Sequence, residues 1–300
     1  MESTTYGENV PSRGIDTVDL FERFLQERTY LKGVSPDTIR YYGCVSRAFE
    51  TILTEPTKAG MLECIQRLLE RGVSPISVNA YLRGLKAYVR WLHQEGYLKE
   101  VFKIQPLKTE QKILGTLTPE QVLRIVRHVP NGTNDRRIHT FACLVLDTGL
   151  RLSEALSLTK DSVDMDNLVI KVRGKGSKYR LIPFSVECRR ILFRYMARQN
   201  TGLVFSTRSG VGITRSNAAR DMGVLGRKLH VTGVRFSPHT LRHTFAVTFL
   251  RNGGDVYMLS RILGHSNITT TTVYLRSMGV DALAEAHQKF SPLAAMRRGV

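Results

Sequence analysis

The sequence predicts a mainly α-helical protein with two domains, of which the first is all helical and the second also contains a small antiparallel sheet. Helical periodicity dominates the chain up to about residue 97, and the stretch 97–118 interrupts it. Alternating, strand-like segments occur only after that interruption. With 300 residues, 42% of them hydrophobic, the chain is long enough to form a core in each domain.

The first domain is expected to hold four helices. The segments "KGVSPDTI" and "RGVSPISV" each combine a glycine that can end one helix with a Ser-Pro pair that can start the next. Ser35 and Ser74 would be the N-caps, with the following prolines at the first helical position. Together with the apolar face of "IDTVDLFERFLQERTYL", these signals predict helices near residues 15–31, 36–54, 58–71 and 75–97.

The domain boundary is predicted where "YLKEVFKIQPLKTEQKILGTLT" loses any sustained period. This segment contains Pro106 and several lysines, and so long a structureless stretch inside one compact domain would be unusual. We therefore expect a flexible N-terminus at 1–14, a helical domain at 15–97, a basic linker at 98–117 and a second domain at 118–300.

The second domain is expected to combine helices with one hairpin. Thr118 and Pro119 start a helix, and "HTFACLVLDTG" is predicted to be a buried helix followed by "LRLSEALSL". In "NLVIKVR", Leu168, Ile170 and Val172 share one face of a strand, "GKGS" makes the turn and "KYRLIPF" returns. Further helices are expected near 185–198, 215–229, 238–251, 255–263 and 280–288.

The charge of the chain favours a polyanionic partner. There are 44 Lys and Arg against 26 Asp and Glu, which gives a formal net charge of +18. No apolar run reaches membrane-spanning length, and the polar N-terminus lacks a signal-peptide core. The four widely spaced cysteines are typical of small buried thiols rather than of disulfides, so we expect a cytoplasmic protein without a membrane partner.

The segment "SPHTLRHTF" places long polar side chains at the start of an apolar helix. With Ser237 as N-cap and Pro238 next, His239 lies in the first turn and Arg242 follows along the same face. A helix N-terminus favours anions, and an imidazole with a bidentate guanidinium would complete a phosphate-binding site. His243 is interpreted as a hydrogen-bonded core histidine.

The same segment has a metal-binding alternative. His239 and His243 have the i, i+4 spacing of paired zinc ligands, but no glutamate lies between them as in HExxH. Arg242 would also repel a dication. A zinc hydrolase is therefore disfavoured, and no metal site is predicted.

Five more residues could carry chemistry, although each also has an ordinary structural interpretation. Arg151 and Glu154 could be a phosphate-binding arginine with its orienting carboxylate, or a surface ion pair. Lys175, on the turn "GKGSKYR", could be a proton donor or a solvated lysine. His265 follows a glycine, and Tyr274 follows four threonines, which are poor helix formers. Its phenol could be a nucleophile or a half-buried aromatic group.

The ordered segments "TGLRLSEAL", "GKGSKYRLIP", "HTLRHTFA" and "LGHSNITTTTVY" resemble the tyrosine recombinase (phage integrase) family in residues and approximate spacing. The resemblance covers about residues 15–290, and the layout is similar to the compact, two-domain Xer and Cre recombinases. It implies an all-α, SAM-like core-binding domain followed by a mixed α/β catalytic domain of the tyrosine recombinase type. One departure is Arg276, where many members carry histidine.

The resemblance implies site-specific DNA recombination through a covalent 3′-phosphotyrosine intermediate, as in integration, excision or dimer resolution. The catalytic residues that it implies are Tyr274 as nucleophile, Arg151, Arg242 and His265 as phosphate ligands, Lys175 as general acid, His239 as general base and Glu154 in support. It implies no cofactor and no metal.

Double-stranded DNA is the partner that the resemblance implies, bound by a homo-oligomer that forms a tetramer on two DNA sites. A C-terminal helix at 280–288 would dock on a neighbouring subunit, and an accessory protein or partner recombinase could join the assembly. Phosphate contacts are expected at Lys108, Lys112, Arg215, Arg220, Arg227 and Arg235.

Two other functions stay open on the sequence. A type IB topoisomerase-like enzyme would nick and reseal DNA as a monomer. A DNA-binding regulator with an inactive site would bind without cutting, and it is disfavoured because every catalytic position is filled.

Overall fold

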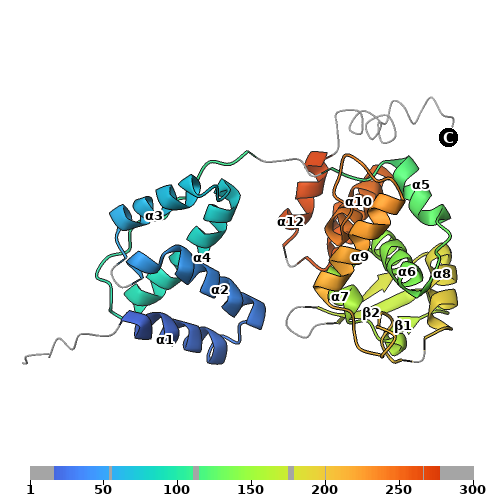
Figure 1. Ribbon diagram of the computed structural model, residues 1–300, viewed down its shortest axis with the longest axis horizontal. Helices are drawn as coiled ribbons and strands as arrows, with labels where there is room; N and C mark the ends of the chain where they lie inside the picture. Colours follow the sequence, from blue (N-terminus) through green and yellow to red (C-terminus); the bar gives the residue numbers. More distant parts are fainter. Residues whose placement is uncertain are drawn as a thin grey trace, which may run out of the picture. The chain divides into compact units, whose positions relative to one another are not determined.

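The computed structural model describes residues 17–53, 56–110, 115–174, 179–199, 201–265 and 267–277. The chain divides into two compact units, Met1–Gln111 and Lys112–Val300, which are labelled by element in Figure 1. Each unit is described by itself.

Unit 1 is built from helices whose starts follow the predicted capping signals. The Ser35 and Ser74 hydroxyls accept hydrogen bonds from the backbone N–H groups of Thr38 and Ser77, and a proline follows each cap. The elements are α1 (Thr17–Tyr30), α2 (Pro36–Ala48), the 3₁₀ helix η1 (Glu50–Ile52), α3 (Lys58–Glu70) and α4 (Pro75–Gln94).

The core of unit 1 gathers around α4. The rings of Phe24 and Tyr88 lie edge to face, with centroids 5.3 Å apart, and Phe24 also packs on Trp91. The indole N–H of Trp91 donates to Glu27 at 2.8 Å, so the polar atom of this buried ring is paired. These contacts tie α4 to α1.

The predicted linker, 98–117, is shorter in the structure than the sequence suggests. Ile104 is buried in the core of unit 1, and the side chain of Asn79 bonds both the N–H and the carbonyl of Leu107, at 2.7 and 2.9 Å. At the other end, Leu117 belongs to the core of unit 2, where its N–H donates to Thr244. The connection between the units is therefore confined to the residues between Leu107 and Leu117.

Unit 2 combines helices with a three-stranded antiparallel sheet. The sheet order is β1-β2-β3, and Ile170 pairs with Ile182 across the hairpin. The elements are α5 (Pro119–Arg127), α6 (Thr133–Thr148), α7 (Leu152–Leu156), η2 (Lys160–Ser162), β1 (Val163–Asp164), β2 (Val169–Arg173), β3 (Tyr179–Pro183), α8 (Val186–Met196), α9 (Arg215–Lys228), α10 (Pro238–Arg251), α11 (Val256–Leu263), α12 (Thr269–Thr272) and η4 (Val273–Ser277).

One detail of the predicted strand is wrong. Leu168 was expected to share a strand face with Ile170 and Val172, but its φ of 56° places it in the left-handed region, before β2 begins. Its side chain still packs against the core, so the apolar pattern was correct while the strand boundary was not.

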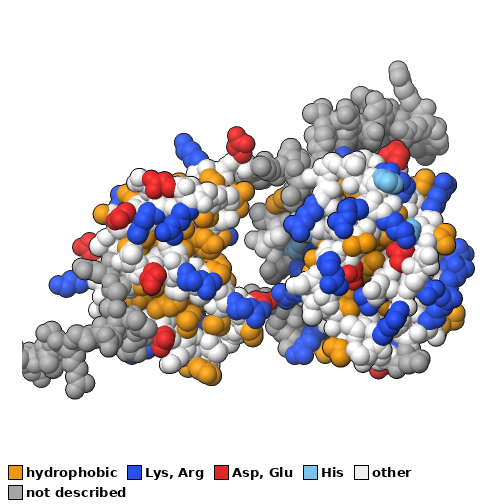
Figure 2. Space-filling model, viewed as in Figure 1, with side chains coloured by type: hydrophobic (Ala, Val, Ile, Leu, Met, Phe, Trp, Pro, Cys, Tyr) orange, Lys and Arg blue, Asp and Glu red, His pale blue; other side chains and the backbone are white. Residues whose placement is uncertain are grey.

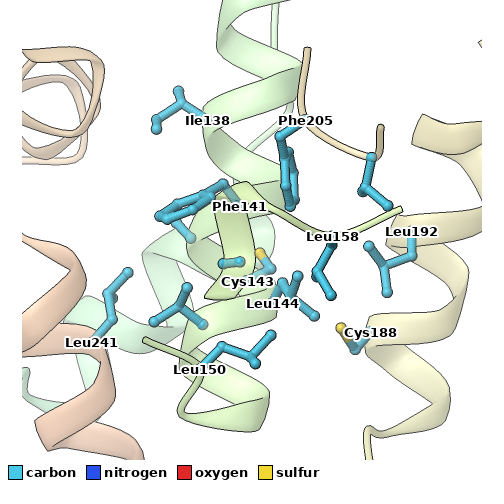
Figure 3. Packing of buried hydrophobic residues seen from close by; sticks show 14 of the residues in the cluster. Ile138, Phe141, Cys143, Leu144, Leu150, Leu158, Cys188, Leu192, Phe205 and Leu241 are labelled. Atoms are coloured by element: carbon cyan, nitrogen blue, oxygen red, sulfur yellow. The ribbon is translucent and has the colours of Figure 1, made fainter. Parts of the chain in front are cut away.

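Helix α6 is the centre of the unit 2 core and contacts α8, α9 and α10. Figure 3 shows Phe141 and Leu144 of α6 among side chains that come from other segments, including Leu192 of α8 and Leu241 of α10. These four side chains are buried. The core thus fixes the start of α10 and the end of α6, two of the places where the candidate site is built.

The predicted fold class, mainly α with a small antiparallel sheet after an all-helical first domain, is confirmed. The predicted flexible N-terminus and the predicted helix at 280–288 lie outside the described residues. Within the described part of the chain, no helix is both long and apolar enough to cross a membrane.

Candidate active site

Five of the predicted catalytic side chains lie together in unit 2, and they come from segments far apart in the sequence. Arg151 is the N-cap of α7, and Glu154 lies within this helix. Arg242 lies in α10, His265 follows α11 and Tyr274 lies in η4. The hydrogen bonds and ring contacts described below connect all five.

Two other predicted residues have different positions. His239 is exposed in the first turn of α10, one turn before Arg242. Lys175 falls in 175–178, outside the described residues, between the strand residues Arg173 and Tyr179, which pair with each other.

Arg242 is buried, and helix ends hold its guanidinium. It donates to the Gly149 carbonyl at 2.5 Å and to the Leu263 carbonyl at 3.0 Å, at the C-terminal ends of α6 and α11. Carbonyls at a helix C-terminus lack intrahelical partners and carry partial negative charge, so they stabilise a buried cation. Burial, followed by the nearby Arg151, lowers the pKa of Arg242, but a guanidinium stays charged in proteins.

Glu154 lies between two arginines, which explains why this carboxylate is buried. Arg180 binds it with two parallel hydrogen bonds of 2.9 Å, and Arg151 donates to it at 2.8 Å from its side chain and at 2.9 Å from its backbone N–H. Burial opposes ionisation, but the bonds from Arg180 and Arg151 outweigh it and lower the pKa of Glu154 to about 2. The carboxylate therefore holds Arg151 in one orientation, with its other terminal nitrogen on the Gly264 carbonyl at 2.8 Å.

Arg180 is a residue of this network that was not predicted from the sequence. Its position in β3 gave a usable signal, because strand alternation puts it on the same face as the buried Ile182. An arginine on the core face of a strand needs an anionic or carbonyl partner. Here the partners are Glu154 and the Ile262 carbonyl, the latter at 3.0 Å.

Gly264 has to be a glycine for two reasons. Its φ is +64°, as the left-handed C-cap of α11, and a Cβ there would lie 2.7 Å from the guanidinium carbon of Arg180. Because the backbone of Gly264 comes so close to the guanidinium of Arg180, Arg180 can bind the Ile262 carbonyl and Arg151 can bind the Gly264 carbonyl.

Replacing Glu154 by Gln is expected to destabilise the fold by roughly 3 kcal/mol at pH 7, because two guanidinium groups lose their counter-charge. The carboxyl's pKa is lowered on folding, so its stabilisation is present above about pH 4.5 and is lost as the pH falls towards 2. The difference in unfolding free energy between wild type and Glu154→Gln should therefore be smaller at pH 3 than at pH 6, as urea unfolding can measure. A constant difference at both pH values would contradict this prediction.

His265 is held from both ring nitrogens. Its Nε2 lies 2.9 Å from the Arg242 guanidinium, and its Nδ1 lies 2.8 Å from the hydroxyl of Thr271. Burial, then the charges of Arg242, Arg151 and Arg180, lower the pKa of His265 to about 4. The imidazole is therefore neutral at neutral pH.

Tyr274 lies against the arginine and histidine groups of its own unit. Its side chain is 8% exposed and packs in an apolar cluster with Leu250 and Leu263. Its ring stacks on His265, with centroids 6.3 Å apart and planes 13° apart, and its hydroxyl interacts with the Arg242 guanidinium. The predicted nucleophile and the predicted phosphate ligands Arg242 and His265 thus form one site.

His243 is buried, as predicted for a core histidine. It is 2% exposed, and its ring lies 5.3 Å from that of Tyr274. The metal-binding alternative requires His239 and His243 to bind the same ion, but His239 is exposed whereas His243 is buried. Among the described residues, no group of three or more His, Cys, Asp or Glu is arranged to hold a metal ion.

The residues expected to contact DNA phosphates are exposed where the structure describes them. Arg215, Arg220 and Arg227 lie along α9, and Arg220 also pairs with Asp221 at 3.3 Å. Arg235 lies between α9 and α10, and Lys108 follows the part of the chain attached to unit 1. Lys112 lies outside the described residues.

Comparison with known proteins identifies relatives along almost the whole chain. Tyrosine recombinase XerA of Thermococcus onnurineus is 30% identical over 277 residues, covering 91% of this chain and 95% of XerA. Tyrosine recombinase XerD of Staphylococcus haemolyticus is 26% identical over 295 residues, covering 92% of this chain and 99% of XerD.

The fold is also that of a solved integrase. The Tn1549 transposon integrase, in complex with a circular intermediate DNA, has a TM-score of 0.72 at 22% identity, covering 91% of this chain and 99% of the integrase. The family model described as "Phage integrase family" matches residues 115–279, a range that contains all seven predicted catalytic residues. The predicted resemblance is thus confirmed, and the chain belongs to the phage integrase family of tyrosine recombinases.

Proposed function

We propose that Tyr274 is the nucleophile with which this tyrosine-type site-specific recombinase cuts DNA. The observation that carries the proposal is the single site in which the Tyr274 hydroxyl meets the Arg242 guanidinium, with His265 bonded to the same arginine. A phenol is a weak nucleophile, so it needs an electrophilic phosphate placed against it. The buried Arg242 guanidinium, fixed by two helix ends, provides a rigid donor for such a phosphate.

The reaction is the attack of the Tyr274 oxygen on a backbone phosphorus of DNA. A 3′-phosphotyrosine bond forms, and the bond to the 5′ oxygen breaks to release a 5′-hydroxyl. Arg151 and Arg242 would bind the non-bridging oxygens as negative charge grows on them, and His265 would add a hydrogen bond. Glu154 orients Arg151 through the bonds described above.

Two proton transfers complete the step. His239 would accept the phenol proton and Lys175 would protonate the leaving 5′ oxygen, both as the resemblance implies. The covalent linkage conserves the free energy of the phosphodiester, so ligation needs only a 5′-hydroxyl from another strand. Cutting and rejoining with exchanged partners is recombination.

Binding of duplex DNA is supported by charge. The chain carries a formal net charge of +18, and Figure 2 shows that Lys and Arg side chains prevail over Asp and Glu on the visible face of unit 2. We assign phosphate contacts to Arg215, Arg220 and Arg227 of α9, together with Lys108, Lys112 and Arg235. Affinity should fall steeply with salt because counterions are released on binding. We place the protein in the cytoplasm, with its DNA.

The working form that we propose is a homo-oligomer, a tetramer on two DNA sites. The predicted helix at 280–288 has an apolar face with Leu283 and Ala286, and it follows the site in the sequence. A groove of about 720 Å³ in unit 2, lined by α5, α6, α8 and α10, has apolar walls that such a helix of a second copy would fill. Sedimentation of the DNA complex with and without residues 278–300 tests this assembly; an unchanged complex would contradict it.

One experiment separates this function from its two alternatives. The protein is mixed with fragmented host DNA, denatured with detergent, and any DNA that stays attached is sequenced. Attached DNA that shares one sequence supports a site-specific recombinase. Relaxation of a supercoiled plasmid that lacks this sequence would support the topoisomerase-like alternative, and DNA binding without attachment would support an inactive regulator.

A further inference from the structure

The run of four threonines before Tyr274 contains one member that differs from the others. Thr271 is fully buried, and its hydroxyl lies 2.8 Å from Nδ1 of His265. Thr269 and Thr270 are exposed, and the Thr272 hydroxyl bonds only the nearby Thr269 carbonyl among the described contacts. Thr271 is therefore the threonine that contacts a residue of the site.

The hydrogen bonds around His265 determine where its proton is. A guanidinium has donors and no acceptor, so the 2.9 Å contact from Arg242 makes Nε2 the acceptor. A neutral imidazole carries one N–H, which must then be on Nδ1. This N–H points to the Thr271 hydroxyl, which accepts it.

In this tautomer His265 cannot perform its proposed role. To donate a hydrogen bond to a phosphate oxygen it needs a proton on Nε2, the nitrogen that now accepts from Arg242. A second proton is opposed by burial and by three guanidinium groups nearby, which keep the pKa of His265 near 4. The imidazole of His265 therefore has to exchange its proton on Nδ1 for one on Nε2 while the ring stays neutral.

A hydroxyl is the partner that allows this exchange, because it can both donate and accept. We propose that Thr271 is a positioning residue that supports both tautomers of His265, the Nδ1–H form without DNA and the Nε2–H form with a phosphate in the site. When the phosphate draws the Arg242 donor away, Nδ1 loses a proton to water and Nε2 takes one from water. The Thr271 hydroxyl then rotates and donates to Nδ1.

The inference rests on the proposed role of His265, and the first test measures the tautomer without any reaction. In ¹⁵N-labelled wild-type protein without DNA, the ring signals of His265 are identified by their loss in His265→Ala. The proton is expected on Nδ1. In Tyr274→Phe bound to the DNA captured above, it is expected on Nε2. A proton on Nε2 in the free protein, or no change on binding, would overturn the inference.

Kinetics test the role of the hydroxyl. Thr271→Val keeps the shape and removes the hydroxyl, so the single-turnover cleavage rate should fall by roughly 10- to 100-fold with DNA affinity unchanged. Thr271→Ser should restore the rate, and Thr272→Val, the matched control in the same run, should retain it. An unchanged rate in Thr271→Val would overturn the inference.

A double-mutant cycle separates positioning from a general effect on folding. In a His265→Ala background, Thr271→Val should cause no further loss, because the residue acts only through the imidazole. An equal loss in both backgrounds would show a structural role and overturn the inference. Failure of wild type itself to attach to DNA would instead contradict the proposed function, and it would leave the tautomer measurement valid.

Discussion

Tyr274→Phe is expected to abolish covalent attachment to DNA while folding and DNA binding stay unchanged. The ring contributes the packing against His265, His243 and the apolar cluster, and phenylalanine keeps all of these contacts. The substitution removes only the hydroxyl, and Arg242 keeps its hydrogen bonds to the Gly149 and Leu263 carbonyls. Detergent-resistant attachment measured by gel electrophoresis should therefore fall to background, and the dissociation constant in a gel-shift experiment should not change.

Tyr257→Phe is the matched control for this variant. Tyr257 lies in α11 and is 60% exposed, so loss of its hydroxyl should affect neither attachment nor binding. Attachment that survives in Tyr274→Phe would assign the nucleophile to another residue.

Arg242→Lys is expected to lower the cleavage rate by about 10²–10³-fold, the usual effect of removing one donor to a transition-state oxyanion. A lysine keeps the positive charge, but its single nitrogen cannot reach the Gly149 and Leu263 carbonyls, the His265 ring and a phosphate together. The melting temperature should also fall, because two buried carbonyls lose their donors. DNA affinity should change far less, since most of it comes from other phosphate contacts.

The effect of Arg242→Lys is best measured against Arg194→Lys. Arg194 is exposed on α8, so this variant makes the same chemical change away from the site. Single-turnover cleavage under saturating protein separates the rate of the chemical step from binding. Equal rates for the two variants would contradict a role of Arg242 in the transition state.

Much of the fold followed from local signals in the sequence. Ser35, Ser74 and Thr118 were identified as N-caps before a proline, and all three accept the expected hydrogen bond. Such signals involve residues three positions apart, so no knowledge of tertiary structure is needed to use them. The start of β2 after Leu168 and the length of the linker depend on contacts with distant residues, and they were predicted less well.

In the candidate site, too, local patterns predicted some features, whereas others depend on contacts between distant residues. The residue types and their order indicated the family, but no local pattern revealed that Arg180 binds Glu154 across 26 positions or that Arg151 binds Gly264 across 113. His243 was predicted to be buried, and only the structure shows that it faces Tyr274. Local patterns therefore identified the elements, whereas the hydrogen bonds that orient the predicted catalytic groups arise from tertiary packing.

The central claim is that Tyr274 becomes covalently bonded to DNA, and mass spectrometry of the attached complex tests it most directly. Digestion of the wild-type complex with nuclease and trypsin should yield the peptide "ILGHSNITTTTVYLR" (262–276), which contains a single tyrosine. The predicted result is this peptide carrying a nucleotide through its 3′ phosphate on Tyr274. A nucleotide on any other peptide, with 262–276 unmodified in the attached fraction, would contradict the claim.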